Sequence, residues 1–84
     1  MLDYDQFVSR LLKLLDADIA TPVNPYDGLY TDLGFDSLQA FQIIVISERL
    51  ADVDIPPMDI PEIYTMADAH GYYRSLSAER ERSV

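Results

Sequence analysis

The stretch Asp32-Leu33-Gly34-Phe35-Asp36-Ser37-Leu38 separates a long turn-rich segment from the most apolar part of the chain. Asp36 is a favoured helix N-cap, and Gln39 follows three residues later, which completes a capping-box pattern. The sequence therefore predicts a helix that begins at Ser37 and runs to about Leu50. The Ser37 hydroxyl would lie in its first turn, where free amide groups and the positive end of the helix dipole favour an anion.

A second predicted helix precedes this stretch, over residues 3–16. Asp3 is its cap, and Gln6 again stands at the capping-box position. Apolar residues recur at helical spacing and are expected to face the core; they are Tyr4, Phe7, Val8, Leu11, Leu14 and Leu15. The two helices are joined by a proline- and glycine-punctuated loop over residues 20–35, a length that is often functional in compact domains.

After the central helix, a short helical turn is predicted at 59–64 and a last helix at 66–76, capped by Thr65 with Asp68 in support. The fold class predicted is all-α: three main helices plus a short third one. Residues 77–84 are polar and are expected to form a disordered tail. The tyrosines at 26 and 30 are expected to pack the long loop onto the core.

Composition bounds the function classes. The 84 residues carry a net charge of −9, and residues 26–62 hold eight of the fifteen acids against Arg49 alone. That field repels nucleic acid and anionic membranes and attracts basic proteins, although solubility alone would also explain it. No apolar run approaches the ~20 residues of a membrane span. The chain has no cysteine, which suits a reducing compartment, so a cytoplasmic location is expected.

Leu33-Gly34-Phe35-Asp36-Ser37-Leu38 resembles the phosphopantetheine attachment motif of acyl carrier proteins. It follows one amphipathic helix and a long loop, as in that family. Asp54-Ile55-Pro56, residues 59–64 and residues 65–76 resemble the later parts of the family's fold. The resemblance covers about residues 3–76. It implies a four-helix carrier bundle, with residues 1–76 as the carrier domain.

The resemblance also implies a chemistry. A phosphopantetheinyl transferase would move a 4'-phosphopantetheine arm from coenzyme A to Ser37, with Gly34, Asp36 and Leu38 forming the attachment motif. The arm's thiol would then hold an acyl or aminoacyl group as a thioester. The implied partners are an acyl- or aminoacyl-activating enzyme and downstream synthase or tailoring enzymes. The carrier, a monomer, would supply a tether and no catalysis of its own.

The helix after the serine departs from fatty-acid carriers, which are rich there in acids. Gln39, Gln42 and Arg49 occupy positions that are often acidic in the family. The partner surface is therefore expected to be more apolar; its predicted residues are Leu38, Phe41, Val45, Glu48, Asp32 and Asp36. This favours a free-standing carrier of polyketide or nonribosomal-peptide metabolism, which includes antibiotic biosynthesis, over general fatty-acid synthesis.

Other interpretations stay open. Ser37 could be an ordinary serine beside a helix cap, or the chain could be an unmodified acidic module that docks to a larger enzyme. A hydrolase built on Ser37, His70 and an aspartate is formally possible, but no oxyanion-loop signature accompanies it. His70 is the sole histidine and has no cysteine beside it, so no metal site is predicted.

Overall fold

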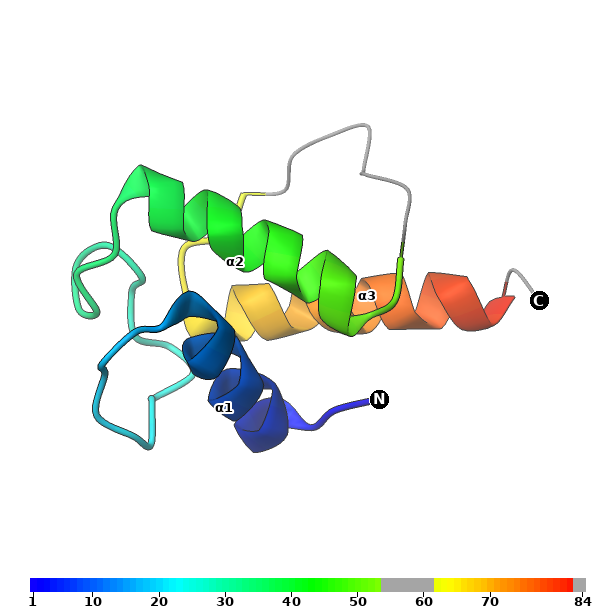
Figure 1. Cartoon of the computed structure of the whole chain (residues 1–84), viewed down its shortest axis with the longest axis horizontal. Coiled ribbons are helices and arrows are strands. Elements are labelled where there is room, and N and C mark those ends of the chain that lie inside the picture. Colours follow the sequence, from blue (N-terminus) through cyan, green and yellow to red (C-terminus); the bar gives the residue numbers. More distant parts are fainter. Residues whose placement is uncertain (54–61, 83–84) are drawn as a thin grey trace.

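The computed structural model describes residues 1–53 and 62–82 (Figure 1). It contains three helices: α1 (Tyr4–Leu15), α2 (Ser37–Leu50) and α3 (Met66–Arg82). Within the described residues there is no strand, only an isolated bridge between Gly28 and Thr65. The predicted all-α class is confirmed. The fourth helix is not: residues 59–61 lie outside the described part of the chain, and Glu62–Tyr64 are not helical.

The first two helices begin where the sequence predicts. In each, the cap carboxylate accepts the N–H of the glutamine three residues on, and that glutamine's side chain accepts the N–H of the cap. Asp3 and Gln6 form this capping box at α1, and Asp36 and Gln39 form it at α2. Both helix starts therefore satisfy two otherwise free amide groups locally, without help from the rest of the fold.

Helix α3 also begins as predicted, since Thr65 Oγ1 accepts the Asp68 N–H at 3.1 Å and Asp68 accepts the Thr65 N–H at 3.1 Å. Its predicted end near residue 76 is wrong, because the helix continues to Arg82. The extension consists largely of good helix formers, and Arg80 pairs with Asp52 at 2.9 Å beyond the end of α2. Most of the segment predicted as a disordered tail is thus helical.

The long loop is held against the bundle by aliphatic and phenyl side chains, not by its tyrosines. Val23, Leu29 and Phe35 are all buried, whereas Tyr26 is 82% exposed and Tyr30 is 44% exposed. The prediction that these two tyrosines pack onto the core is therefore wrong. Three apolar side chains pack the loop against the core, and the hydroxyl groups of Tyr26 and Tyr30 stay in contact with water.

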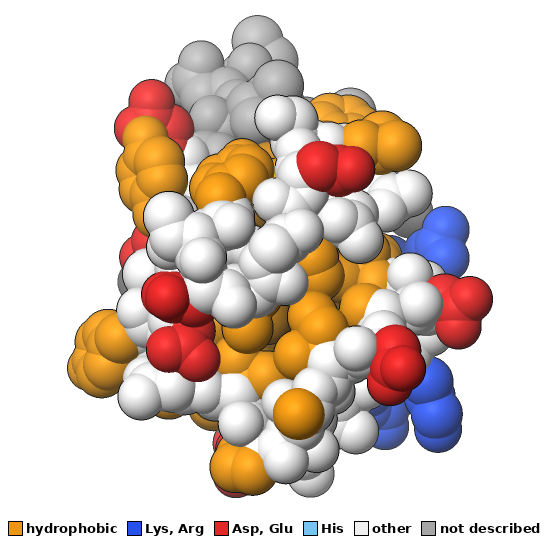
Figure 2. All heavy atoms as spheres, turned by 90° about the vertical axis from the view of Figure 1, so that its left-hand side faces the viewer, with side chains coloured by type: hydrophobic (Ala, Val, Ile, Leu, Met, Phe, Trp, Pro, Cys, Tyr) orange, Lys and Arg blue, Asp and Glu red, His pale blue; other side chains and the backbone are white. Residues whose placement is uncertain are grey.

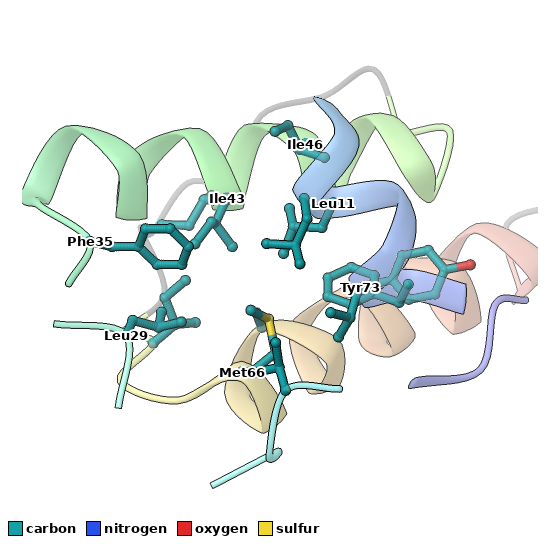
Figure 3. Close-up of a cluster of buried hydrophobic side chains, with 14 of the residues drawn as sticks. Leu11, Leu29, Phe35, Ile43, Ile46, Met66 and Tyr73 are labelled. Carbon is teal, nitrogen blue, oxygen red and sulfur yellow. The ribbon is translucent and has the colours of Figure 1, made fainter. Parts of the chain in front are cut away.

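One hydrophobic core joins the helices and the loop. Figure 3 shows Leu29 and Phe35 of the loop meeting Ile43 of α2 and Met66 of α3, with Leu11 of α1 and Tyr73 of α3 alongside. In α1 the buried residues are Phe7, Val8, Leu11 and Leu12. Leu14 was expected to face the core but is 49% exposed, because the buried arc of α1 is centred nearer Val8 and Leu12.

Helices α2 and α3 run in the same direction, so their first turns lie at one end of the molecule, beside the long loop (Figure 1). Two bonds tie this end together: the Leu29 N–H donates to the Tyr64 carbonyl at 2.8 Å, and the Ala67 N–H donates to the Pro25 carbonyl at 2.7 Å. Residues that are far apart in sequence therefore surround the start of α2. No helix within residues 1–53 and 62–82 is long and apolar enough to cross a membrane.

Candidate functional site

Ser37 is the first residue of α2, and its side chain is exposed. The Asp36 carboxylate accepts the Gln39 N–H at 2.8 Å. Within the described residues, the N–H groups of Ser37 and Leu38 have no acceptor. An anion attached to the Ser37 hydroxyl would therefore meet two free donors and the positive end of the helix dipole. These features fit a phosphate ester at this position.

The backbone before Ser37 is held in one path by the loop. Gly34 has a φ of +73°, a conformation that L side chains rarely adopt, while an added Cβ would meet nothing within 4 Å. Its place in the motif is thus explained by backbone conformation, not by space. Next to it, buried Phe35 donates its N–H to the Leu29 carbonyl at 2.9 Å. Ser37 is therefore presented from an anchored loop.

Asp32 has a structural role in the loop that the sequence did not indicate. Its carboxylate accepts the Gly28 N–H at 2.7 Å, and its own N–H donates to the Gly28 carbonyl at 3.0 Å. Asp32 therefore closes a turn of the loop and is also an exposed acid near the start of α2. Figure 2 shows this end of the molecule, where acidic side chains lie among apolar ones and basic side chains stand at one border.

A pocket of about 290 Å³ opens beside Ser37. It is lined by one residue of the loop, four of α2 and three of the segment before α3; they are Tyr30, Ser37, Ala40, Phe41, Ile44, Glu62, Ile63 and Tyr64. We call this pocket the Ser37 cleft. Sequence reasoning found Ser37 and Phe41 but missed Tyr30, Glu62 and Tyr64, because only the tertiary fold brings them to α2.

Among the described residues that line the Ser37 cleft, Glu62 supplies a carboxylate and none carries a basic side chain. The Tyr64 hydroxyl donates to Glu62 Oε2 at 3.1 Å. This hydrogen bond raises the pKa of the Tyr64 phenol, and the negative charge of Glu62 adds to the effect. The cleft therefore combines aromatic and aliphatic walls with one hydrogen-bond-accepting, negatively charged edge.

The predicted partner residues on α2 are accessible. Leu38 is 65% exposed, Phe41 51% and Val45 41%. Together with Leu14 and Arg49 they line a groove of about 410 Å³ between the end of α1 and α2. Glu48 is partly buried, and this burial raises the pKa of its carboxyl. The structure brings the apolar residues onto one stripe; their role in binding a partner stays a prediction.

His70 lies away from this site. Its ring packs near those of Tyr4, Phe7 and Tyr73, and its Nε2 is 3.2 Å from the Leu2 carbonyl oxygen. None of these contacts involves Ser37, so the geometry gives no support to a serine hydrolase built on the two residues. Across residues 1–53 and 62–82, no three metal-ligating side chains are grouped to hold an ion.

Comparison with known proteins identifies the same region. The family model described as the phosphopantetheine attachment site matches residues 6–69. Over 65 residues, the chain is 34% identical to a curated protein of Schizosaccharomyces pombe named "Putative acyl carrier protein, mitochondrial". The aligned part covers 77% of this chain and 55% of that protein, so the chain spans about half the length of this relative. No solved structure gives a significant match.

The name of this relative corrects one expectation. The absence of cysteine led to the prediction of a cytoplasmic location, but the relative is described as mitochondrial. The cytoplasmic prediction is therefore contradicted. Its physical basis was weak, because a chain without cysteine cannot form a disulfide in any compartment and so gives no information about the surrounding redox state.

The family match covers most of α1, the long loop, α2 and the first turn of α3, which are the elements around Ser37. Acyl carrier proteins are carriers and not catalysts, which agrees with the expectation of a tether without enzymatic activity. On this match and the identity with the curated relative, the chain belongs to the acyl carrier protein family, the phosphopantetheine-binding carriers that hold 4'-phosphopantetheine covalently.

Proposed function

We propose that Ser37 is the residue that carries the phosphopantetheine arm, and that the thiol of the arm holds an acyl or aminoacyl group as a thioester. The observation that carries this proposal is the exposed Ser37 hydroxyl in the first turn of α2, beside the two free amide groups. In the transfer, the Ser37 oxygen forms a bond to the phosphorus that bears the pantetheine, the pyrophosphate bond of coenzyme A breaks, adenosine 3',5'-bisphosphate leaves, and the hydroxyl proton is lost. When bound, the arm supplies a flexible tether that ends in a thiol.

The arm on Ser37 would raise the effective concentration of its cargo at each partner enzyme, to the millimolar range for a short flexible tether. The chain's own residues position the start of that tether. Asp36 and Gln39 hold the first turn of α2, and Gly34 and Phe35 hold the loop before it. No step of the cargo's chemistry needs to occur on this chain.

The test is modification by a broad-specificity phosphopantetheinyl transferase with coenzyme A, followed by intact mass measurement. The protein should gain one phosphopantetheine, and Ser37→Ala should gain none. Ser9→Ala, which changes an exposed serine of α1, should be modified like the unaltered chain. An unmodified chain, under conditions that modify a known carrier protein, would show that the proposal is wrong.

We also propose that α2 binds partner enzymes through Leu38, Phe41 and Val45, with Asp32, Asp36 and Glu48 supplying negative charge at the edges. The exposure of the three apolar side chains supports this, since a solvated helix face seldom carries such a stripe without a partner. Phe41→Asp should weaken binding to an activating or synthase enzyme, whereas Arg74→Asp on the exposed side of α3 should not.

The small number of acidic residues on α2 further supports a role in a dedicated biosynthetic pathway of polyketide or nonribosomal-peptide type. Ser47 and Ile46 on this helix are buried, and the outward positions Gln39 and Gln42 are neutral. The discriminating experiment is to incubate the holo-protein with acyl- and aminoacyl-activating enzymes and weigh the product. Loading by fatty-acid enzymes alone would contradict this assignment.

The same exposed stripe supports a second candidate, an unmodified docking module. The two candidate functions predict different results for the Ser37→Ala variant. If Ser37→Ala retains full activity in the presence of its partner enzyme and Phe41→Asp loses it, the docking module is correct and the carrier is not.

A further inference from the structure

A groove of about 410 Å³ runs between the end of α1 and the exposed face of α2. We call it the α1–α2 groove. Phe41 lines both this groove and the Ser37 cleft, but Ser37 lines only the cleft. The side chains of the α1–α2 groove that carry the following argument are Leu14 and Leu15 of α1 and Leu38, Phe41, Val45 and Arg49 of α2.

The groove gathers the exposed aliphatic and phenyl side chains of the molecule. Leu14, Leu38, Phe41 and Val45 are each between 41% and 65% exposed, and all four line it. The other large apolar residues exposed in the described part of the chain are Met1 and three tyrosines, whose hydroxyl groups suit a surface position. Purely apolar exposure is thus concentrated in one place, as it is where another chain covers the surface.

The shape of the groove fits a helix. Leu38, Phe41, Val45 and Arg49 follow α2 at helical spacing, so they form one stripe about 16 Å long at 1.5 Å per residue. Leu14 supplies the facing wall from α1. A channel between two helices accepts the side-chain ridge of a third helix. An extended strand would need free backbone groups beside it, and the backbone groups of α1 and α2 bond within their own helices.

The charge of the groove limits the chemistry of its occupant. Among the described residues that line it, Arg49 is the only charged one, and it makes no ion pair within residues 1–53 and 62–82. It stands at the end of the apolar stripe, in a chain with fifteen acidic and six basic side chains. A carboxylate at the matching end of a partner helix would form a charge-assisted hydrogen bond with this guanidinium.

A second copy of the chain is a poorer occupant than a different protein. Each chain carries a net charge of −9, so two copies repel each other as they approach. A partner helix needs only one carboxylate, at the position that faces Arg49, and its other polar positions are free to be neutral or basic.

We propose that the α1–α2 groove binds an amphipathic helix of a partner protein, whose apolar face packs on Leu14 and Phe41 and whose carboxylate pairs with Arg49. This inference rests on the proposed binding of partners by α2 and extends it in two respects. Helix α1 contributes to the surface, and the partner carries negative charge at this end, opposite in sign to the charge that the acidic residues near Ser37 attract.

The direct test uses two synthetic helical peptides that differ in one residue. Both have leucines at positions i, i+3 and i+7; one has glutamate at i+11 and the other has glutamine there. Each is titrated into the full chain and followed by nuclear magnetic resonance. The methyl groups of Leu14, Leu38 and Val45 should shift, whereas those of Leu29, which is 0% exposed in the core, should not. The glutamate peptide should bind up to about five-fold more tightly, although the net charge of the chain opposes it.

Matched variants assign the preference to Arg49. Arg49→Gln should abolish the difference in affinity between the two peptides, and Arg74→Gln, which removes an exposed cation of α3, should preserve it. Arg49 also suits the negative end of the α2 dipole. If that were its whole role, Arg49→Gln would lower Tm and leave the preference for glutamate unchanged, which would contradict the inference. Leu14→Asp should weaken the binding of both peptides.

Other outcomes would also overturn the inference. It is wrong if the two peptides bind the unaltered chain equally, or if neither shifts the resonances of the groove. It is also wrong if the unaltered chain sediments as a dimer that Leu14→Asp dissociates, because a second copy is then the occupant.

Binding to the activating or synthase enzyme separates this failure from that of the proposed function. If Phe41→Asp weakens enzyme binding but Leu14→Asp and Arg49→Gln do not, α2 binds its partners without the groove. If Phe41→Asp has no effect, the proposed partner surface itself fails.

Discussion

Replacing Asp36 by alanine tests whether the cap of α2 holds the turn that contains Ser37, apart from its contribution to the stability of the whole domain. The carboxylate accepts the Gln39 N–H at 2.8 Å, and in return Gln39 Oε1 accepts the Asp36 N–H at 3.0 Å. Loss of such a cap costs ~1 kcal/mol, within a range of about 0.5–2. For a domain of this size, 1 kcal/mol corresponds to a fall in Tm of about 4–8 °C.

The chain provides a matched control. Asp3 forms the same capping box at α1, with distances of 2.8 and 3.1 Å to Gln6, and both caps are exposed. Asp3→Ala should therefore lower Tm by a similar amount. Only Asp36→Ala frays the turn that contains Ser37, and a change of ~1 kcal/mol alters the closed-to-open ratio of that turn about five-fold. Phosphopantetheine transfer should slow by up to that factor in Asp36→Ala and stay unchanged in Asp3→Ala.

The assay combines thermal unfolding by circular dichroism with a time course of intact mass in the presence of transferase and coenzyme A. Asp36→Asn retains the cap without the charge; it should keep Tm close to that of the unaltered chain, and any remaining loss of rate then reports the charge alone. The reasoning is refuted if Asp36→Ala leaves Tm unchanged, or if Asp3→Ala slows the transfer as much as Asp36→Ala does.

Three further predictions concern the fold. Met66→Ala removes a side chain that is 0% exposed at the centre of the core and should lower the free energy of unfolding by about 2–5 kcal/mol in urea titrations; a loss below about 1 kcal/mol would contradict the packing described. The pKa of Asp68 is lowered because its carboxylate accepts the N–H of Tyr64 and, as a smaller effect, the N–H of Thr65. The ionised Asp68 therefore stabilises the fold at pH values above its ordinary pKa of 3.8, and this contribution is lost as the pH falls through the lower pKa of the folded state. The stability difference from Asp68→Ala should therefore be constant near neutral pH and shrink below pH 3.8 in acid titrations; a constant difference down to pH 2 would refute the assignment. Arg80→Ala breaks an exposed pair with Asp52 and should cost at most ~1 kcal/mol, with a salt dependence that a buried pair would not show.

The helix starts could be predicted because their determinants are local. Each capping box joins residues three apart, and such a pattern is visible without knowledge of the fold. The exposure of Leu38, Phe41 and Val45 was also predictable, since α2 carries more apolar positions than one face can bury. The end of α3 was predicted too early, although its last turns consist largely of good helix formers; the Arg80–Asp52 pair that accompanies them joins distant parts of the chain.

The loop and the cleft needed the tertiary structure. The order of the loop residues does not show that Leu29 is buried while Tyr30 is exposed. The Leu29 N–H donates to the Tyr64 carbonyl, and this bond joins positions 35 residues apart along the chain. For the same reason Glu62 and Tyr64 were not assigned to the site. Leu12 is buried and Leu14 is not, because Phe7, Val8, Leu11 and Leu12 form one arc of α1 and Leu14 lies outside it.

The sequence by itself thus determined the all-α class, the start of each main helix and the motif around Ser37, since capping and hydrophobic period act within one or two helical turns. The tertiary structure alone decided what surrounds Ser37: a loop anchored by Leu29 and Phe35, and a cleft assembled from the loop, α2 and the segment before α3. Such surroundings depend on long-range packing, in which each contact is possible only once the whole core has closed.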